Sequence, residues 1–468
     1  MKITFFGAAR NVTGSKHLIQ TQGFNLLLDC GMYQGRRDQS NQSNRTLPFS
    51  SKDINAVILS HGHVDHSGLL PVLVKEGFMG RIYCTGPTAE ITKYLLEDSA
   101  SIQEKDCDYF NSHLREGESP ISPIYTSNEA ERTFAYFEPV SYFNRSSEWT
   151  ELNKNIRFKF YDAGHILGSA ITFLEIKEGG ETKTLVFTGD LGRENLPILR
   201  SPEAVEEKAQ TMIMECTYGA RVHRPIGEVA ESLKEAVHFA IRKKSKIIVP
   251  AFALGRAQEL IYIIHKLIDE KCIPKIPIYF DSPLSQNLTA IFARSAKYFD
   301  EEFWEDFGNR RESPFSFENL HYVSSLEESK AINRKQGPLM IIAASGMAEG
   351  GRILHHLKNS IGDPNSMVLI TGFQAENTLG RKILEGVSPV RIFGWNYDVR
   401  AKVAVLNELS AHADQKDLLS RVEETNGLER LFLVHAEISQ AMAFKDLAGS
   451  SFPGLPIEIP ELGQTFEV

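Results

Sequence analysis

Short apolar runs and longer helical periodicities alternate along the chain, and their order divides it into two regions. Up to about residue 200, apolar runs of strand length dominate, such as KITFFG (2–7), NLLLDCG (25–31), NAVILSH (55–61) and AITFLEIK (170–177). Runs of this length that end at glycine or polar residues predict β-strands. Gly179 and Gly180 separate AITFLEIK from TKTLVFTGD, and this spacing predicts a hairpin.

The second region alternates strands with helices, whereas the first consists mostly of strands. Helical patterns are already present in the first region at SGLLPVLVKEG (67–77) and TAEITKYLLEDSASIQEKD (88–106). From about residue 206 to 394, strands and helices alternate regularly, as where KIIVPAF leads into RAQELIYIIHKLIDE and PLMIIAAS into GRILHHLKNSI. This alternation predicts β-α-β units around a parallel sheet. The tail returns to strands, with ERLFLVHAE and a final strand pair.

Composition excludes several classes of protein. A length of 468 residues corresponds to about two to four domains, and 42% hydrophobic with 24% charged residues excludes a disordered or fibrous chain. The net charge of −9 excludes a global positive field, so a nucleic-acid partner would need a local patch or metal ions. Five cysteines without a CxxC pair indicate free thiols in a reducing compartment. Without a signal peptide or a membrane-length apolar run, a cytoplasmic location is expected.

The strongest chemical signal is LSHGHVDHSG, which directly follows a predicted strand. Its ligand-type side chains are His61, His63, Asp65 and His66. His61 and His63 project to one side of an extended segment, so one ion can bind both. Asp65 and His66 lie where the chain turns into a helix, and they are expected to face a second ion. Imidazole and carboxylate ligands suit Zn²⁺, or less specifically Mn²⁺ or iron; the alternative is a His-rich polar loop.

Three more polar residues end predicted strands. His165 in DAGHILGSA and Asp190 in VFTGDLG are flanked by glycine, as expected where the backbone crowds an ion. Alone, each would more often be structural, but the HxHxDH pattern makes both candidate ligands. Asp29 in LLLDCG ends a buried strand and is expected to accept a hydrogen bond from a ligand imidazole rather than bind the ion.

Through HGHVDH, DAGH and FTGD, the chain resembles the metallo-β-lactamase superfamily. ECTYG (Glu215), SAHAD (His412) and VHAE (His435) resemble the additional motifs of its β-CASP branch, which cleaves nucleic acids. PAFALGRAQEL, YFDSPL, ASGMAEGGRILHHL and GFQAENTLGR are similar to further segments of that branch. Within the branch, the chain resembles compact bacterial and archaeal ribonucleases related to the cleavage subunit of mRNA 3′-end processing.

The resemblance implies an α/β architecture, namely the metallo-β-lactamase αββα sandwich with an inserted α/β (β-CASP) domain. Residues 1–200 and 395–468 would form the sandwich, the second of these ranges with the RNA-metabolising tail motif. Residues 201–394 would form the inserted domain, and the active site would lie in the cleft between the two bodies.

The resemblance also implies two zinc ions and a role for each motif. One ion would be bound by His61, His63, His165 and Asp190, and the other by Asp65, His66, Asp190 and His435. Two ions that share Asp190 can hold a hydroxide that attacks a phosphodiester, leaving a 5′-phosphate and a 3′-hydroxyl. The leaving oxygen needs a proton, and His412, oriented by Glu215, is the candidate general acid. The alternatives are a loop histidine and a capping carboxylate. The expected catalytic residues are Asp65, His412, Glu215 and Asp29.

RNA is the expected substrate because RNA-processing members of the branch carry histidine at the position of His435, whereas DNA-processing members tend to carry valine. The turn AASGM lacks the HxSGH pattern of members that degrade RNA from its 5′ end, which favours an endonuclease.

Candidate RNA contacts lie in the second region. Ser345 and Gly346 open a strand-to-helix turn, where free N–H groups can bind phosphate. Arg256, Arg352 and Arg381 each follow a glycine near such a turn, and a salt bridge is the alternative role for each.

Two other function classes stay open on the sequence. The first is another hydrolase of the superfamily, acting on a thioester, a lactone or DNA, and the second is an inactive RNA-binding subunit. ECTYG and SAHAD argue against a small-ester enzyme, and the complete ligand set argues against an inactive chain. Because family members are often dimers through the C-terminal segment, a homodimer is also considered; no membrane partner is expected.

Overall fold

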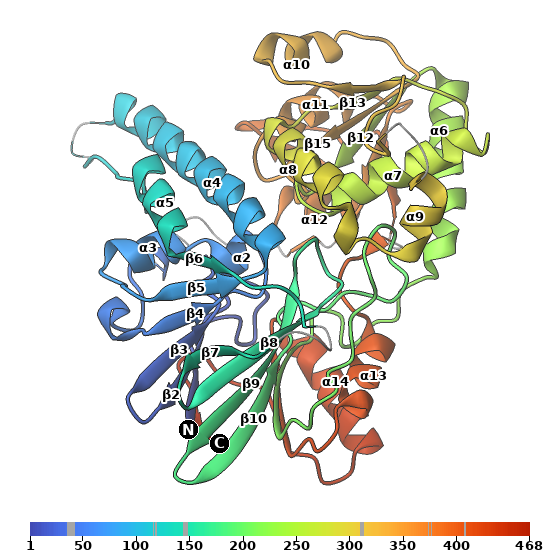
Figure 1. Ribbon diagram of the computed structural model, residues 1–468. Coiled ribbons are helices and arrows are strands. Elements are labelled where there is room, and N and C mark those ends of the chain that lie inside the picture. The colour runs from blue at the N-terminus through green and yellow to red at the C-terminus, as the bar shows by residue number, and fades with distance from the viewer. Residues whose placement is uncertain are drawn as a thin grey trace. The chain divides into compact units, whose positions relative to one another are not determined.

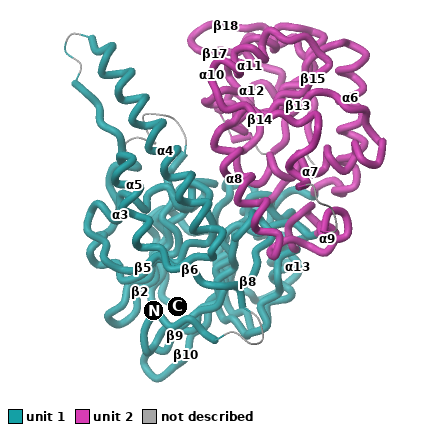
Figure 2. The backbone as a smooth tube through the Cα atoms, turned by 45° about the horizontal axis from the view of Figure 1, so that its top comes forward, with its two compact units in different colours: residues 1–194, 201–222, 412–468 teal, residues 195–200, 223–411 magenta. Residues whose placement is uncertain are grey.

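A computed structural model describes residues 1–34, 43–115, 117, 119–143, 148–308, 313–372, 374–375, 377–406 and 409–468. Parts of GFQAENTLGR and of the predicted strand KVAVLNEL lie outside these ranges. The chain divides into two compact units (Figure 2). Unit 1 comprises Met1–Glu194, Ser201–Val222 and His412–Val468, and unit 2 comprises Asn195–Arg200 and His223–Ala411. Unit 2 therefore reaches further along the chain than the expected boundary at residue 394.

Two seven-stranded sheets form the centre of unit 1 (Figure 1). In spatial order, the first sheet contains β22 (Thr465–Glu467), β1 (Lys2–Phe5), β2 (His17–Thr21), β3 (Phe24–Leu28), β4 (Ala56–Ile58), β5 (Arg81–Cys84) and β6 (Phe137–Pro139). The second contains β21 (Ile457–Glu458), β20 (Arg430–Val434), β11 (Thr211–Glu215), β10 (Glu181–Phe187), β9 (Ala170–Glu178), β8 (Ile156–Asp162) and β7 (Thr150–Asn153).

The inner strands are apolar on both faces because helices cover both outer faces of the sandwich. In β11, Ile213 packs into the core between the two sheets, whereas Met212 and Met214 pack into a second core on the outer face. The helices over that face are α13 (Gln415–Glu424) and α14 (Ile438–Ser451), and those over the first sheet are α3 (Leu70–Lys75), α4 (Gly86–Ser112) and α5 (Ser127–Thr133). Successive side chains of a strand point to opposite faces of the sheet. Because both faces are covered by apolar layers, these strands appear in the sequence as continuous hydrophobic runs. The predicted αββα fold class is confirmed.

Local predictions in unit 1 are confirmed with changed bounds. The predicted hairpin joins β9 to β10, with Glu178 paired to Glu181. The helical segment 67–77 is divided between the end of α2 (Val64–Ser67) and α3. The two last strands do not pair with each other: β21 joins β20 in the second sheet, and β22 joins β1 in the first.

Unit 2 is built on a parallel sheet, as the alternation of strands and helices predicts. In spatial order its strands are β14 (Leu320–Tyr322), β13 (Ile278–Phe280), β15 (Leu339–Ala343), β12 (Lys246–Pro250), β16 (Met367–Ile370) and β19 (Lys402–Val405). Its helices are α6 (Val229–Lys243), α7 (Arg256–Asp269), α8 (Pro283–Arg294), α9 (Glu301–Phe307), α10 (Leu326–Ile332), α11 (Ile353–Ser360) and α12 (Leu379–Leu384), and β17 (Val390–Ile392) pairs with β18 (Trp395–Tyr397). Among the described residues, none of the helices has the length and apolar character needed to cross a membrane.

Candidate metal centre

The ligand-type residues of the sequence motifs come together in unit 1 because they follow the ends of its strands. His61 follows β4, Asp190 follows β10 and His435 directly follows β20. Strands β3 and β4 are parallel in the first sheet, and β10, β11 and β20 are parallel in the second. The carboxyl ends of parallel strands lie at the same edge of a sheet, so residues far apart in sequence meet there.

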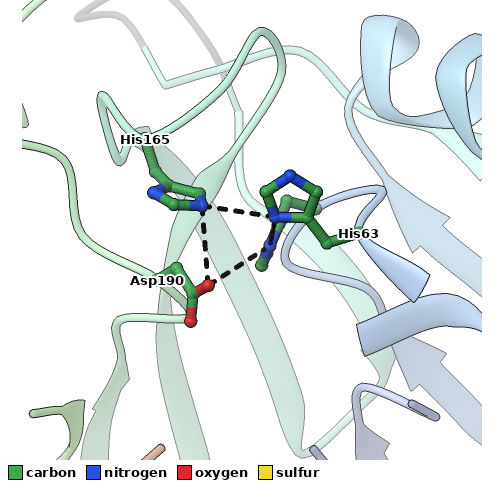
Figure 3. A group of neighbouring side chains, drawn as sticks. His63, His165 and Asp190 are labelled. Carbon is green, nitrogen blue, oxygen red and sulfur yellow. Dashed lines mark hydrogen bonds and ion pairs between the residues drawn. The ribbon is translucent and has the colours of Figure 1, made fainter. Parts of the chain in front are cut away.

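The first group of ligand atoms contains His61, His63, His165 and Asp190, which lie within 4.8 Å of one another. Figure 3 shows His63, His165 and Asp190 directed toward one another. His63 Nδ1 lies 3.0 Å from His61 Nε2 and 3.3 Å from His165 Nε2. Asp190 Oδ2 lies 3.5 Å from Nε2 of both His61 and His165. The structure thus brings together the four residues expected at the first ion.

The second group contains Asp65, His66 and His435. Asp65 Oδ2 lies 3.3 Å from His435 Nε2 and 4.0 Å from His66 Nε2. Asp190 reaches this group with its other oxygen, since Oδ1 lies 3.3 Å from His66 Nε2 and 3.6 Å from His435 Nδ1. One carboxylate therefore lies between the two groups with one oxygen toward each.

The chemistry of this cluster fits divalent cations. Burial lowers the pKa of His61 well below its usual value and that of His63 to about 4, whereas at His66 the Asp190 and Asp29 carboxylates outweigh burial and raise the pKa well above its usual value. His66 Nε2 and Asp190 Oδ1 are buried and face each other at 3.3 Å, and neither receives a hydrogen bond from any other part of the described chain. Burying several carboxylates together is costly unless positive charge compensates, and divalent cations can supply that charge. Imidazole nitrogens with carboxylate oxygens form the donor set that Zn²⁺ prefers.

Asp29 lies behind the ligands, at the end of β3, with a left-handed φ of 58°. Its Oδ2 is 2.6 Å from His66 Nδ1, the ring nitrogen opposite the one that faces Asp65 and Asp190. This placement agrees with the role expected for Asp29.

Ser60 connects Asp29 to a second histidine, and sequence reasoning missed it. The Ser60 backbone N–H donates to Asp29 Oδ1 at 2.8 Å. Its hydroxyl lies 3.0 Å from Asp29 Oδ2 and 3.0 Å from His61 Nδ1. The available signal was its position immediately before His61.

His412 lies beside the centre and is held by Glu215. His412 Nδ1 lies 2.8 Å from Glu215 Oε1, and the same carboxylate accepts hydrogen bonds from the backbone N–H groups of Leu191 and Thr217 at 2.8 and 3.1 Å. Burial favours the neutral ring, but the Glu215 carboxylate outweighs it and raises the pKa of His412 to about 9.

His412 also belongs to a third group of close ligand atoms, with Asp190 and His435. Its Nδ1 is 3.9 Å from Asp190 Oδ2, but the contact to Glu215 is much shorter. The geometry therefore favours a ring that is oriented by Glu215 over a ring that binds an ion through Nδ1.

The three candidate arginines lie in unit 2, and each has a carboxylate partner. The pairs are Arg256 with Glu259, Arg352 with Asp281 and Arg381 with Glu385. Asp281 is fully buried and also contacts His356 Nε2 at 2.7 Å, so Arg352 belongs to a buried network. The salt bridges considered as the alternative are thus present in all three cases.

Ser345 and Gly346 differ from the expected geometry. They follow β15, but α11 begins only at Ile353, so they lie in a loop before the helix and not at its N-terminus. The left-handed backbone of Ala348 and Gly351, with φ of 57° and 77°, prevents the helix from starting earlier. The Ser345 hydroxyl accepts a hydrogen bond from the Glu349 N–H at 3.1 Å.

Comparison with known proteins adds independent information. The family model described as the metallo-beta-lactamase superfamily matches residues 14–251. The Beta-Casp domain matches residues 257–383, and the Zn-dependent metallo-hydrolase RNA specificity domain matches residues 396–460.

Several curated proteins are similar over nearly the whole chain. Ribonuclease TTHA0252 of Thermus thermophilus is 35% identical over 447 residues, which is 96% of each chain. Transcription termination factor FttA of Methanosarcina mazei is 31% identical over 98% of this chain and 70% of its own length. The RNase J-like protein of Methanocaldococcus jannaschii is 29% identical over 94% of each chain. A crystal structure of a protein of unknown function from Enterococcus faecalis V583 shares the fold, with a TM-score of 0.52, 13% identity and 99% coverage of both chains.

Proposed function

This chain belongs to the metallo-β-lactamase superfamily and to its β-CASP branch, and from that premise we propose how this metal-dependent ribonuclease cuts RNA. The proposed reaction is zinc-dependent hydrolysis inside an RNA strand, which leaves a 5′-phosphate and a 3′-hydroxyl. The observation that carries the proposal is the pair of ligand groups that Asp190 joins within unit 1.

We assign one Zn²⁺ to each group. The first would be held by His61, His63, His165 and Asp190, and the second by Asp65, His66, Asp190 and His435. When bound, two such cations lower the pKa of water and offset the negative charge that grows on the phosphate. The mixed nitrogen and oxygen donors favour Zn²⁺, while Mn²⁺ and iron are accepted by the same donor types.

The residues of the chain handle the two protons of the reaction. The oxygen of a water molecule attacks phosphorus, and the bond from phosphorus to the 3′ oxygen breaks. We assign Asp65, whose side chain is 19% exposed, to accept the proton that the water loses. His412 donates a proton to the leaving 3′ oxygen, and Glu215 stabilises the protonated ring through Nδ1. Asp29 supports the site indirectly, by holding the ring of His66.

The three candidate arginines of unit 2 can be ranked as RNA contacts by how easily a phosphate could replace the carboxylate partner of each. The Arg381–Glu385 pair is exposed, with side chains 30% and 51% accessible, so a phosphate can replace Glu385 at little cost. The Arg256–Glu259 pair is buried, and breaking it would leave a buried charge. Arg352 is tied to buried Asp281. We therefore favour Arg381, with the loop of Ser345 and Gly346, over Arg256 and Arg352.

A circular RNA tests the proposal directly. The zinc-loaded protein is incubated with a circular RNA, the linear RNA of the same sequence, and the matching circular single-stranded DNA. We expect the RNA circle to be opened, the products to carry 5′-phosphates, and the DNA circle to stay intact. Degradation of the linear RNA alone would mean that the enzyme is an exonuclease. Cleavage of the DNA circle at a similar rate would favour the DNA nuclease considered from the sequence.

A further inference from the structure

A histidine can bind a metal ion only through a ring nitrogen that carries no hydrogen, so the position of the ring hydrogen matters. A neutral imidazole has one nitrogen that carries hydrogen and one that carries a free lone pair, and only the second can bind a cation. The hydrogen-bond partner of the first nitrogen therefore decides which nitrogen is available. Two buried hydroxyl groups contact ring nitrogens in the metal centre, one in each ligand group.

Thr217 provides the first of these hydroxyls. Its Oγ1 lies 3.0 Å from the carbonyl oxygen of His435 and 3.0 Å from Nδ1 of the same residue. A carbonyl can only accept, so the single hydroxyl hydrogen points to it; otherwise two oxygens at this distance would face each other with lone pairs alone. Oγ1 must then accept from Nδ1–H, which leaves the Nε2 lone pair free. Nε2 is the atom that lies 3.3 Å from Asp65 Oδ2.

The backbone of His435 is held on both sides at this point. His435 has a left-handed φ of 50°, which is uncommon for a residue with a side chain. Its N–H donates to the carbonyl of Ala8 at 2.7 Å, and its own carbonyl accepts from Thr217. Thr217 is only 4% exposed, so water has little access to take over its hydroxyl's contacts.

Ser60 repeats the arrangement in the first ligand group. Its hydroxyl lies 3.0 Å from Asp29 Oδ2, and an ionised carboxylate can only accept. The hydroxyl oxygen must then accept from His61 Nδ1–H, also at 3.0 Å. His61 Nε2 is left with its lone pair, 3.5 Å from Asp190 Oδ2. Ser60 is 1% exposed.

We infer that Thr217 and Ser60 are positioning residues that fix the ring tautomers of His435 and His61, so that Nε2 of each is set to bind a cation before the cation arrives. The inference rests on the proposed function in one respect, because it takes these histidines as metal ligands. The ring tautomers themselves are a property of the metal-free chain and can be measured without any cleavage assay.

A matched pair of variants at Thr217 gives the cleanest test. Thr217→Val keeps the shape of the side chain and removes the hydroxyl, whereas Thr217→Ser keeps the hydroxyl. The full chain is labelled with nitrogen-15 histidine, stripped of metal and examined by NMR at about pH 8, where a histidine of ordinary pKa is neutral. The His435 signals are identified by their loss in His435→Gln. We expect the Nδ1–H tautomer in wild type and Thr217→Ser, and a shift toward the Nε2–H tautomer in Thr217→Val.

Zinc affinity, measured by competition with a chromophoric chelator, is the second readout. Loss of such a supporting contact weakens metal binding by about 10- to 100-fold. We expect this loss in Thr217→Val and a change below about threefold in Thr217→Ser. A Thr217→Val chain with the wild-type tautomer and wild-type affinity would overturn the inference. Correct tautomers in a protein that cuts no RNA would instead overturn the proposed function and leave this inference standing.

Ser60→Ala serves as the reciprocal control and also covers the case in which Thr217→Val does not fold. It should change the ring signals of His61 and leave those of His435 unchanged, while Thr217→Val should do the reverse. If both variants changed both histidines equally, the hydroxyls would have only a general structural role, and the assignment of one hydroxyl to each ring would be wrong.

Discussion

At the scale of single residues, the different roles proposed for His412 and His435 follow from their different neighbours. His412 Nδ1 contacts the carboxylate of Glu215, which favours a protonated ring. His435 Nδ1 contacts the neutral hydroxyl of Thr217, and its Nε2 faces Asp65. Glu215 therefore suits His412 to donate a proton, whereas the Nδ1 partners of His66 and His435 leave Nε2 of each ring directed at Asp65.

Replacing these histidines should therefore have different consequences. His412→Ala should keep both metal ions and slow RNA cleavage by about 10²–10⁴-fold, because the leaving oxygen loses its proton donor. His435→Ala should lower the metal content together with the rate. Elemental analysis and initial rates measure both effects.

Bis-p-nitrophenyl phosphate provides the control for His412, because nitrophenolate leaves without a proton. The His412→Ala variant should hydrolyse this substrate with a far smaller loss than it shows on RNA. Loss of metal from His412→Ala, or equal losses on both substrates, would mean that His412 binds an ion or only shapes the site.

At the scale of elements, close contacts between loops position the ligands. Gly192 lies in the loop after β10, and its N–H donates to the carbonyl of Ala163 in the loop after β8 at 2.8 Å. A Cβ at position 192 would lie 1.9 Å from the carbonyl oxygen of Gly164 and 2.8 Å from the backbone nitrogen of His165. The two loops that supply Asp190 and His165 can approach this closely only with glycine there.

Gly192→Ala should therefore separate these two loops. We expect a loss of about 1–3 kcal/mol in the free energy of unfolding, typical of overpacking, and weaker zinc binding at the first group. Urea unfolding and chelator competition measure these changes. Gly449→Ala in α14 is the matched control, because outside its own turn of helix nothing lies within 4 Å of the added Cβ. Equal effects of the two substitutions would contradict the role given to Gly192.

Asp300, at the start of α9 in unit 2, lowers the stability of the folded chain when its carboxyl group is ionised. Asp300 caps this helix and accepts a hydrogen bond from the Phe303 N–H at 2.7 Å. Burial, with smaller contributions from Glu302 and Asp306, raises its pKa to about 6, although Lys266 on α7 acts in the opposite direction. A carboxyl group with a pKa raised on folding prefers to be protonated in the native state, so it costs stability as the pH rises from about 4 to about 6.

Asp300→Asn should keep the cap and remove this cost, since asparagine caps helices about as well as aspartate. After a discount for solvent screening, we expect the free energy of unfolding to rise by about 1 kcal/mol at about pH 7.5 and to change little at about pH 4.5. Urea unfolding at both pH values measures it. A gain that is the same at both values would show that ionisation of Asp300 is not the cause.

At the scale of the whole molecule, the metal centre belongs entirely to unit 1, although its candidate ligands come from two stretches that lie far apart in the chain, Met1–Glu194 and His412–Val468. Cations bound there would connect the first 194 residues to the last 57. Binding at about 100 times the dissociation constant would stabilise the folded unit by about 2.7 kcal/mol.

Removing metal with a chelator should therefore loosen unit 1 specifically. We expect its unfolding midpoint to fall by about 5–10 °C. Hydrogen exchange should increase around Ser60–Ser67 and Gly189–Leu191, while the central strands of unit 2 stay protected. Equal loosening of both units, or no change in either, would contradict the assignment of the cations to this centre.

Much of this organisation can be predicted from the order of residues along the chain. Apolar periodicity predicts the strands and helices because it reflects which faces are buried, and the glycine pair predicts the β9–β10 hairpin because few other residues adopt that turn. The HGHVDH spacing predicts His61 and His63 in one ligand group and Asp65 and His66 in the other, since the backbone sets the directions of neighbouring side chains.

Contacts between residues that are far apart in the sequence depend instead on how the strands pair and pack. Thr217 meets His435, 218 residues further along, only because β11 and β20 pair in parallel with Glu215 beside Val434. The order and register of strands also decide that β21 and β22 join different sheets, and that Asp281 reaches Arg352 and His356. Local backbone preferences extend over a few residues, whereas the partner of a buried polar atom depends on how whole sheets pair and pack. For this reason the candidate ligands can be recognised in the sequence, and the hydroxyls that orient them are recognised only in the folded chain.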